Sequence, residues 1–233
     1  MTAPLRWRLL SFDLDGTLVD TAGEIAAAVN LTLAQVGLPA RRPEAVTLLI
    51  GAGTRELMLA TLREVASETG MAIAAADRDA MLARFDDHYE ATAGSSARPY
   101  PGVVDALARL HRAGIALACV TNKERAFSVK VLAACGLAAA FDLLVAGDTL
   151  AVKKPDARVL RHVIETLGGD APTTAHVGDS RIDVDSARAA GVAAWAVPYG
   201  YNRGEPIAAA RPDRIFRDIG DVAAHVLAGR AAG

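Results

Sequence analysis

Short apolar runs alternate with longer amphipathic segments along most of the chain. A short apolar run bounded by turn residues is typical of a buried strand, whereas apolar positions three and four residues apart predict a helix. By this pattern, strands are predicted at Arg8–Phe12, Ile115–Val120, Leu143–Ala146, Thr174–Val177, Ala193–Val197 and, with a weaker pattern, Arg214–Phe216. Helices are predicted between most of them, at Val103–Arg112, Ala126–Ala134, Asp156–Leu167 and Val184–Ala190. This alternation predicts an α/β fold in which helices cover a parallel sheet.

The interval between the first and second predicted strands is far longer than a helical crossover needs. About a hundred residues separate the two strands, and an ordinary connection is much shorter. Apolar residues recur in it at helical spacing, from Ile25 to Val36, from Leu57 to Val65 and from Met81 to Tyr89. We interpret residues 20–93 as a small helical domain inserted after the first strand, which leaves residues 1–19 and 94–233 for the core.

Composition and charge limit the classes of partner. Of the 233 residues, 52% are apolar and 22% are charged, and the formal net charge is −2, which is ordinary for a globular protein. No basic stretch indicates a nucleic-acid surface, and no apolar run is long enough to span a membrane. The N-terminus lacks the basic head and long apolar core of a signal peptide, which predicts a cytoplasmic protein. Cys119 and Cys135 are predicted to be buried, reduced thiols, and the sequence is compatible with a monomer or a homodimer.

Polar residues follow four of the predicted strands. In an open parallel sheet, ligands bind beyond the carboxyl ends of the strands, and these ends meet at one edge. The residues found there are Asp13, Asp15, Gly16 and Thr17 after the first strand, Thr121 and Asn122 after the second, Gly147, Asp148, Lys153, Lys154 and Pro155 after the third, and Gly178, Asp179, Ser180 and Asp183 after the fourth. One edge of the sheet is therefore expected to carry the chemistry.

Asp13, Asp15, Asp179 and Asp183 would bring four negative charges together at this edge, and these require compensating cations. Like charges brought together are costly, and clustered carboxylate oxygens without nearby His or Cys favour a hard divalent ion, Mg²⁺ above all. Mg²⁺ and Lys154 together suit a phosphoryl group. A carboxylate facing that group can act as a nucleophile and form an aspartyl-phosphate, and a second carboxylate two residues on can protonate the leaving oxygen and then activate water.

The order of these motifs resembles that of the haloacid dehalogenase superfamily. DLDGTLVD, residues 13–20, is similar to its first motif, Thr121-Asn122 to its second, Lys154-Pro155 to its third and GDSRIDV, residues 178–184, to its fourth. The resemblance covers nearly the whole chain. It implies a Rossmann-like core with a parallel sheet, and a small α-helical cap domain inserted after the first strand.

The resemblance also implies a role for each motif residue. Asp13 is then the nucleophile, and Asp15 is the general acid and base, whose backbone carbonyl also binds Mg²⁺. Lys154 offsets the charge on Asp13 and on the phosphoryl group. The remaining implied roles are phosphoryl binding by Thr121 and Asn122, metal binding by Asp13 and Asp179, and support of the metal or of Lys154 by Asp183.

Three features narrow the reaction within that superfamily. Dehalogenases lack an aspartate at the position of Asp15, so its presence favours phosphate chemistry. Phosphonate hydrolysis needs a cap lysine, and residues 20–93 contain none. Mutases of the β-phosphoglucomutase type usually carry a His shortly after the first motif, and the stretch TAGEIAAAVN at that place has none. A phosphatase is therefore favoured over a mutase.

Finer details resemble the bacterial phosphoglycolate phosphatases. The similar stretches include IGAGTRELM, residues 50–58, and YGYNRGEP, residues 199–206. This resemblance implies a Mg²⁺-dependent phosphomonoester phosphatase that hydrolyses 2-phosphoglycolate to glycolate and phosphate. Gly51 and Gly53 would let backbone amides approach a small substrate, and we expect Arg55 to pair with its carboxylate.

Other functions are compatible with the same residues. They are a phosphatase for another small ester such as a sugar or amino-sugar phosphate, a mutase, and a sensor that binds a phosphate ligand without turnover. The complete set of motifs favours an enzyme over a sensor. Lys123 has two interpretations, a positive charge at the mouth of the site or a solvated residue at the start of a helix. His176, within a predicted strand, is expected to be a core histidine.

Overall fold

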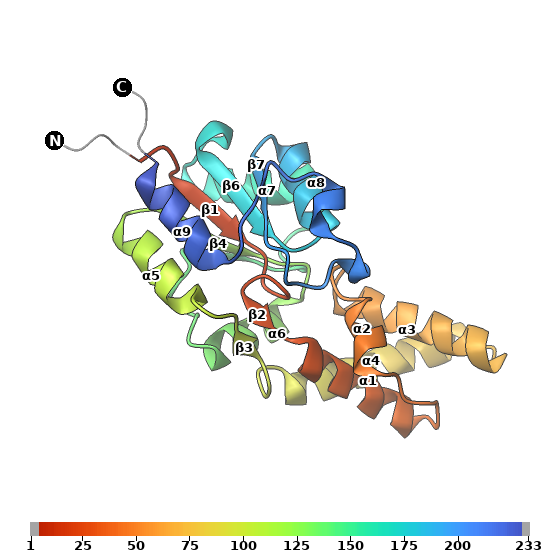
Figure 1. The fold of residues 1–233 in the computed structure, drawn as a ribbon. Coiled ribbons are helices and arrows are strands. Elements are labelled where there is room, and N and C mark those ends of the chain that lie inside the picture. Colours follow the sequence, from red (N-terminus) through yellow and green to blue (C-terminus); the bar gives the residue numbers. More distant parts are fainter. Residues whose placement is uncertain (1–4, 230–233) are drawn as a thin grey trace.

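Six parallel strands form the central sheet of the protein (Figure 1). A computed structural model describes residues 5–229 of the chain. Their order in the sheet is β5-β4-β1-β6-β7-β8, and every neighbouring pair is parallel. The strands are β1 (Leu9–Phe12), β4 (Ala116–Val120), β5 (Leu143–Val145), β6 (Thr174–Gly178), β7 (Ala193–Ala196) and β8 (Arg214–Ile215). The six predicted strands and the α/β fold class are confirmed.

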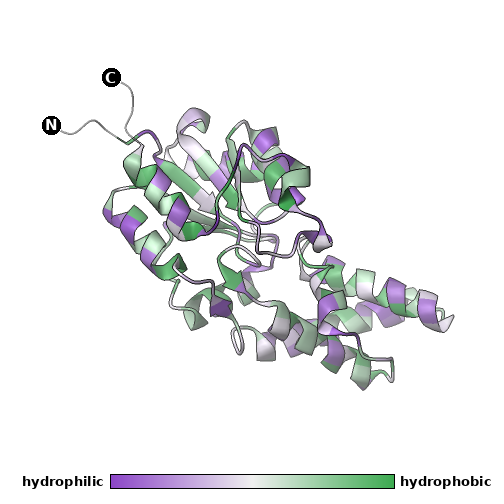
Figure 2. Cartoon of the chain, viewed as in Figure 1, coloured by the Kyte–Doolittle hydropathy of each residue, from purple (hydrophilic) through white to green (hydrophobic). Residues whose placement is uncertain are grey.

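Helices cover both faces of this sheet, so its central strands β1 and β6 are buried along their whole length and mostly apolar, whereas the edge strand β8 is exposed (Figure 2). Successive residues of a strand point to opposite faces. Leu10 and Phe12 of β1 accordingly pack in the cluster that contains residues of α5 (Val103–Arg112) and α9 (Ile219–Ala228), and Leu9 packs in the cluster of α7 (Ala157–Leu167) and α8 (Arg181–Ala190). The helices of the core are α5 (Val103–Arg112), α6 (Arg125–Ala134), α7 (Ala157–Leu167), α8 (Arg181–Ala190) and α9 (Ile219–Ala228), with short 3₁₀ turns η1 (Ala171–Thr173), η2 (Asn202–Gly204) and η3 (Ile207–Ala210).

A group of helices, here called the insert, lies between two short strands and projects from one end of the sheet (Figure 1). The strands β2 (Val19–Asp20) and β3 (Arg98–Pro99) pair antiparallel and bring the two connecting segments side by side. The insert consists of α1 (Ala22–Gln35), α2 (Pro43–Thr47), α3 (Thr54–Thr69) and α4 (Ala75–Thr92). It has a hydrophobic cluster of its own, which Phe127 of α6 joins from the core side.

Several short or displaced elements differ from the sequence pattern. The pattern does not predict α2, α9 or the β2–β3 pair. Helix α8 begins at Arg181, three residues before its predicted start, because Ser180 and Asp183 bond to each other across its first turn. Cys119 and Cys135 are buried and free, as predicted.

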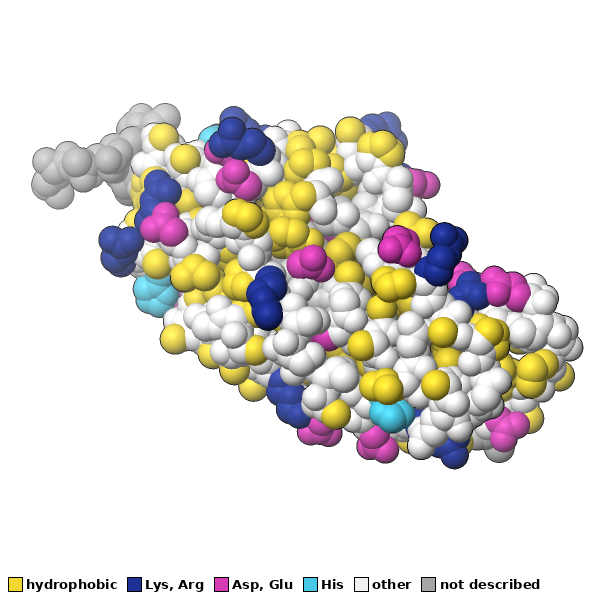
Figure 3. Space-filling model, turned by 60° about the horizontal axis from the view of Figure 1, so that its bottom comes forward, with side chains coloured by type: hydrophobic (Ala, Val, Ile, Leu, Met, Phe, Trp, Pro, Cys, Tyr) yellow, Lys and Arg dark blue, Asp and Glu magenta, His cyan; other side chains and the backbone are white. Residues whose placement is uncertain are grey.

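One face of the molecule, drawn in Figure 3, carries charges of both signs. On the face shown in Figure 3, lysine and arginine side chains lie singly or beside acidic ones and form no continuous basic area. None of the helices within residues 5–229 combines the length and the apolar character that crossing a membrane requires.

Candidate active site

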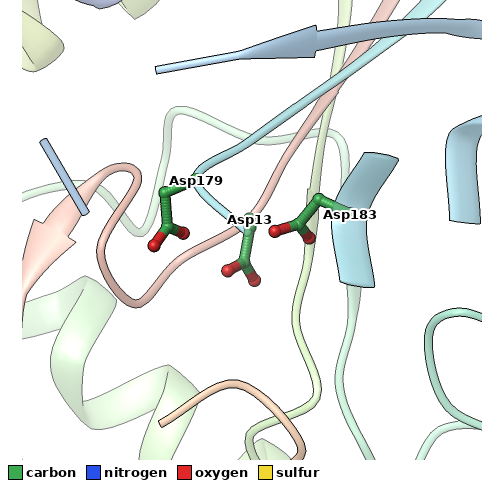
Figure 4. Close-up of side chains that lie close together, drawn as sticks. All are labelled: Asp13, Asp179 and Asp183. Atoms are coloured by element: carbon green, nitrogen blue, oxygen red, sulfur yellow. The ribbon is translucent and has the colours of Figure 1, made fainter. Parts of the chain in front are cut away.

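Three buried aspartates meet at the carboxyl edge of the sheet (Figure 4). Asp13 directly follows β1, Asp179 directly follows β6, and Asp183 lies in the first turn of α8. One carboxylate oxygen from each residue lies within 4.8 Å of those of the other two. The central position of β1 between β4 and β6 is what brings these segments, distant in sequence, to one point.

Two glycines make this close approach possible. A Cβ at Gly178 would lie 2.2 Å from the Cβ of Asp183, and a Cβ at Gly200 would lie 2.1 Å from Oδ2 of Asp179. Both distances are far below contact distance, so any side chain at these positions displaces an aspartate of the cluster. Only glycine therefore fits at position 178, the first residue of the stretch GDSRIDV.

Lys154 neutralises part of the cluster. Its ammonium is buried and donates hydrogen bonds to Asp13 Oδ1 at 2.8 Å, Asp183 Oδ1 at 2.7 Å and the backbone oxygen of Val120 at 2.7 Å. An ammonium has three protons, so these acceptors use all of them. Burial alone would lower the pKa of Lys154, but the two carboxylates outweigh it and raise that pKa. Lys154 is therefore a fixed cation.

Asp183 is held by bonds from several sides. Its Oδ2 accepts from the backbone N–H of Ser180 at 3.1 Å and from the Ser180 hydroxyl at 2.6 Å. Its Oδ1, besides Lys154, lies 3.3 Å from Nε2 of the buried His176, and Nδ1 of that ring lies 2.8 Å from Oγ of Ser11. Burial would raise the pKa of Asp183, but Lys154 and the His176 bond outweigh it and hold this pKa well below its usual range. Asp183 is thus an ionised anchor for Lys154.

Asp13 and Asp179 carry the charge that is left uncompensated. Burial, which outweighs the opposing effect of Lys154, raises the pKa of Asp13 well above its usual value, and the Asp183 and Asp179 charges raise it further. Burial and the Asp183 charge raise the pKa of Asp179 to about 7. Three carboxylates against one ammonium leave an excess of two negative charges, which is what a divalent cation balances. The donor set is all oxygen, and this fits Mg²⁺.

Asp15 lies beside this cluster in a different environment. Its Oδ1 accepts from Thr21 Oγ1 at 2.6 Å and lies 2.5 Å from Nζ of Lys123. Lys123 is buried, with 1% of its side chain exposed, and stands over the ring of Tyr89 at 5.2 Å. Of the two interpretations of Lys123, the solvated helix start is wrong.

Thr121 and Asn122 follow β4 at the same edge of the sheet. The Asn122 side chain donates to the backbone oxygens of Gly51 and Lys154, both at 3.0 Å, and accepts from the Lys154 N–H at 2.9 Å. These bonds fix the loop that carries Lys154. Both N–H groups of the Asn122 side chain are therefore used within the protein.

The insert closes against this edge of the core. A pocket of about 20 Å³ lies between them, which holds little more than one water molecule. Its lining is Asp13, Asp15, Thr121, Asn122 and Lys123 from the core, and Ile25, Ile50, Gly51, Gly53, Thr54 and Leu57 from the insert. Gly51 and Gly53 thus line the same pocket as Asp13 and Asp15. Arg55 is not in this lining: 58% of its side chain is exposed, and it lies 3.7 Å from Asp79.

The structure adds contacts of Asp179 that the sequence motifs did not assign. Thr17 donates to Asp179 Oδ1 at 2.9 Å, and the backbone N–H of Tyr201 donates to Asp179 Oδ2 at 2.6 Å. Thr17 belongs to the first motif and Tyr201 to the YGYNRGEP stretch, so both lie in segments that carry the family resemblance. Their contact with Asp179 needed the three-dimensional structure.

Comparison with known proteins agrees with this geometry. The profile of the family described as haloacid dehalogenase-like hydrolase matches residues 10–197. The chain belongs to this family. It is 43% identical over 200 residues to the plasmid-encoded phosphoglycolate phosphatase of Cupriavidus necator, covering 86% of this chain and 84% of that protein. It is 36% identical to the phosphoglycolate phosphatase of Thiobacillus denitrificans, covering 94% and 96%.

A solved structure of the family has the same fold. The crystal structure of a predicted phosphoglycolate phosphatase from Haemophilus somnus matches with a TM-score of 0.90 and 30% identity, over 93% of this chain and 96% of that one. The family, its α/β fold and a phosphatase type of hydrolase are therefore established for this chain.

Proposed function

We propose that this protein is a Mg²⁺-dependent phosphatase that hydrolyses 2-phosphoglycolate to glycolate and phosphate. The observation that carries the proposal is the buried Asp13 carboxylate, fixed by Lys154 at the sheet edge, with a second carboxylate, Asp15, two residues on. The names of the similar proteins support this choice of substrate.

In the first step, a carboxylate oxygen of Asp13 bonds to phosphorus as the bond from phosphorus to the ester oxygen breaks. Asp15 gives a proton to that leaving oxygen, and glycolate departs. In the second step, Asp15 takes a proton from water, whose oxygen attacks phosphorus and releases Asp13 with inorganic phosphate. Lys154 stays charged throughout and offsets the negative charge near Asp13.

The negative charge of the clustered carboxylates indicates where the metal of this proposal would bind. Asp13, Asp179 and the backbone carbonyl of Asp15 would hold Mg²⁺, with Asp183 behind them. When bound, Mg²⁺ supplies positive charge that balances the carboxylates and a phosphoryl group.

We further propose that residues 20–93 serve as a cap that opens to admit substrate and closes for the reaction. The pocket of about 20 Å³ supports this, because it is too small for a phosphate ester unless the insert moves. Apolar side chains of Ile25, Ile50 and Leu57 limit the room beside Asp13, which favours a small ester over a sugar phosphate.

The test is steady-state kinetics with Mg²⁺ on 2-phosphoglycolate and a panel of sugar and amino-sugar phosphates. We expect the highest kcat/KM for 2-phosphoglycolate and no phosphate release by Asp13→Asn. Asp185→Asn is the matched control, since Asp185 is an exposed carboxylate of α8 that pairs with Arg188. A sugar phosphate with the highest kcat/KM contradicts the substrate, and phosphate release by Asp13→Asn contradicts the nucleophile.

A further inference from the structure

Lys123 occupies a position that the reaction described above does not use. Its side chain is 1% exposed, and the residue lines the small pocket between the insert and the core. Its Nζ lies 2.5 Å from Oδ1 of Asp15, the group that we assign to protonate the leaving oxygen. Burying an ammonium costs desolvation free energy, which further hydrogen-bond partners offset.

The other cations of the chain that were candidates for binding a substrate anion are committed elsewhere. Lys154 directs its three protons at Asp13, Asp183 and the Val120 carbonyl. Arg55 lies at the exposed surface beside Asp79 and outside the pocket lining. Among the residues that line this pocket, Lys123 alone carries a positive charge.

The ammonium of Lys123 has donors to spare. Asp15 is its carboxylate partner, and the ring of Tyr89 lies 5.2 Å from Nζ. An aromatic face attracts the cation but takes no conventional hydrogen bond. A second carboxylate that enters the pocket can therefore bond to the same ammonium while Asp15 stays nearby.

The covalent structure of 2-phosphoglycolate matches this arrangement. A single methylene joins its ester oxygen to its carboxylate carbon. If the ester oxygen lies beside Asp15 for proton transfer, the carboxylate is carried to the immediate neighbourhood of the ammonium that already contacts Asp15. The same placement of an uncharged ester leaves the ammonium without a second partner.

We propose that Lys123 is the specificity-determining residue that binds the substrate carboxylate, in place of Arg55. The inference rests on the proposed function, since it assigns the recognition of a carboxylate-bearing phosphate ester to one residue of the same pocket. It adds that the substrate class is a small ester with an anionic group one carbon away from the ester oxygen.

The test compares 2-phosphoglycolate with ethyl phosphate, which carries a methyl group in place of the carboxylate. Lys123→Gln is expected to lower kcat/KM for 2-phosphoglycolate by about 10- to 100-fold more than for ethyl phosphate, the loss typical of a hydrogen bond to a charged group. Most of the difference is expected in KM. Lys123→Arg, which keeps the charge, should retain the preference, and Lys130→Gln, at an exposed lysine, should leave both substrates unchanged.

Each outcome has a distinct meaning. An equal loss for both substrates in a folded Lys123→Gln protein means that Lys123 acts on Asp15 alone and overturns the inference. Loss of the preference in Arg55→Gln instead would also overturn it. An unsubstituted protein without any preference for 2-phosphoglycolate contradicts the proposed function as well. If Lys123→Gln does not fold, Lys123→Met takes its place in the same comparison of 2-phosphoglycolate with ethyl phosphate, because an apolar side chain of similar length needs no buried partner. An equal loss of kcat/KM for both substrates in that variant again overturns the inference.

Discussion

Lys154 Nζ lies 2.8 Å from Asp13 Oδ1, with both groups buried at the carboxyl edge of the sheet. The same ammonium also bonds to Asp183. Lys154→Met removes the one cation among these carboxylates and leaves buried charges without a partner, which costs about 3–5 kcal/mol. We expect this loss in the free energy of unfolding, measured by urea denaturation without Mg²⁺, together with loss of phosphatase activity.

The matched control for that variant is Lys130→Met. Lys130 pairs at the surface with Glu90, and exposed pairs contribute about 0–1 kcal/mol. Similar losses of stability in the two variants would show that the buried contact of Lys154 with Asp13 is not what stabilises this edge.

Stabilisation by Mg²⁺ is expected to depend on pH. The pKa of Asp13 is raised in the folded protein, and that of Asp179 is raised to about 7, so between about pH 4 and 7 the folded state holds protons that the unfolded chain has released. The metal-free protein therefore loses stability from these groups as the pH rises through this window. The lowered pKa of Asp183 has its effect below this pH window. The stability that this group contributes is lost only as the pH falls under 3.8, the ordinary pKa of an aspartate.

Because Mg²⁺ takes the place of those protons, the increase in Tm that it causes should be larger at pH 8 than at pH 5. Comparing the Tm with and without Mg²⁺ at each pH cancels the contribution of titratable groups that are distant from the cluster. Asp179→Asn is expected to flatten the dependence. An increase in Tm that is the same at both pH values in the unsubstituted protein contradicts the assignment of the metal to these carboxylates.

His176 is expected to matter through Asp183. Its Nε2 lies 3.3 Å from Asp183 Oδ1, and Ser11 Oγ lies 2.8 Å from the other ring nitrogen. His176→Leu removes the donor to Asp183 and leaves the buried Ser11 hydroxyl with only the Ala175 carbonyl oxygen, 3.5 Å away. We therefore expect a loss of about 1–3 kcal/mol in the free energy of unfolding and a reduced kcat. His176→Gln, which keeps an N–H donor, should retain more of both.

Ser186→Ala is the control for that comparison. Ser186 lies on α8 like Asp183, and within the part of the chain that is described its buried hydroxyl has no hydrogen-bond partner. Its removal should change kcat little. A His176→Leu protein with unchanged kcat would mean that Ser180 and Lys154 fix Asp183 without help from the ring.

The parts of the site that follow strands could be predicted from the sequence. Asp13 and Asp179 each come directly after a strand with a clear apolar pattern. Since parallel strands end at the same edge, their proximity follows from the fold class alone. The helices α5 and α7 were likewise predictable, because their apolar residues repeat over two or more turns.

The direction of side chains in loops and at helix starts could not be predicted. Lys123 points inward and Arg55 outward, and local spacing is compatible with either. Thr17 bonds to Asp179 although 162 positions separate them. Helix α2, with five residues, and the two-residue strand β2 are shorter than the window in which a period can be seen.

Tyr201 joins the Asp179 loop to the start of the insert through two separate groups. Its backbone N–H bonds to Asp179, whereas its hydroxyl donates to Asp20 Oδ1 at 2.7 Å and accepts from the N–H groups of Thr21 at 2.9 Å and Ala22 at 3.1 Å. Tyr201→Phe removes only the hydrogen bonds of the hydroxyl and keeps that of the backbone N–H. We expect a loss of about 1–3 kcal/mol in the free energy of unfolding and little change in the Mg²⁺ concentration that gives half-maximal activity.

Gly200→Ala tests the other side of this connection. Its new Cβ would lie 2.1 Å from Asp179 Oδ2, so the carboxylate must move, and we expect a higher Mg²⁺ requirement. Mg²⁺ titrations of activity for both variants, combined with thermal unfolding, separate the two effects. If Tyr201→Phe raises the Mg²⁺ requirement as much as Gly200→Ala does, the contacts of the hydroxyl with residues 20–22 and the position of Asp179 are not independent. The proposed movement of the insert would then be transmitted to the Asp179 carboxylate through Tyr201.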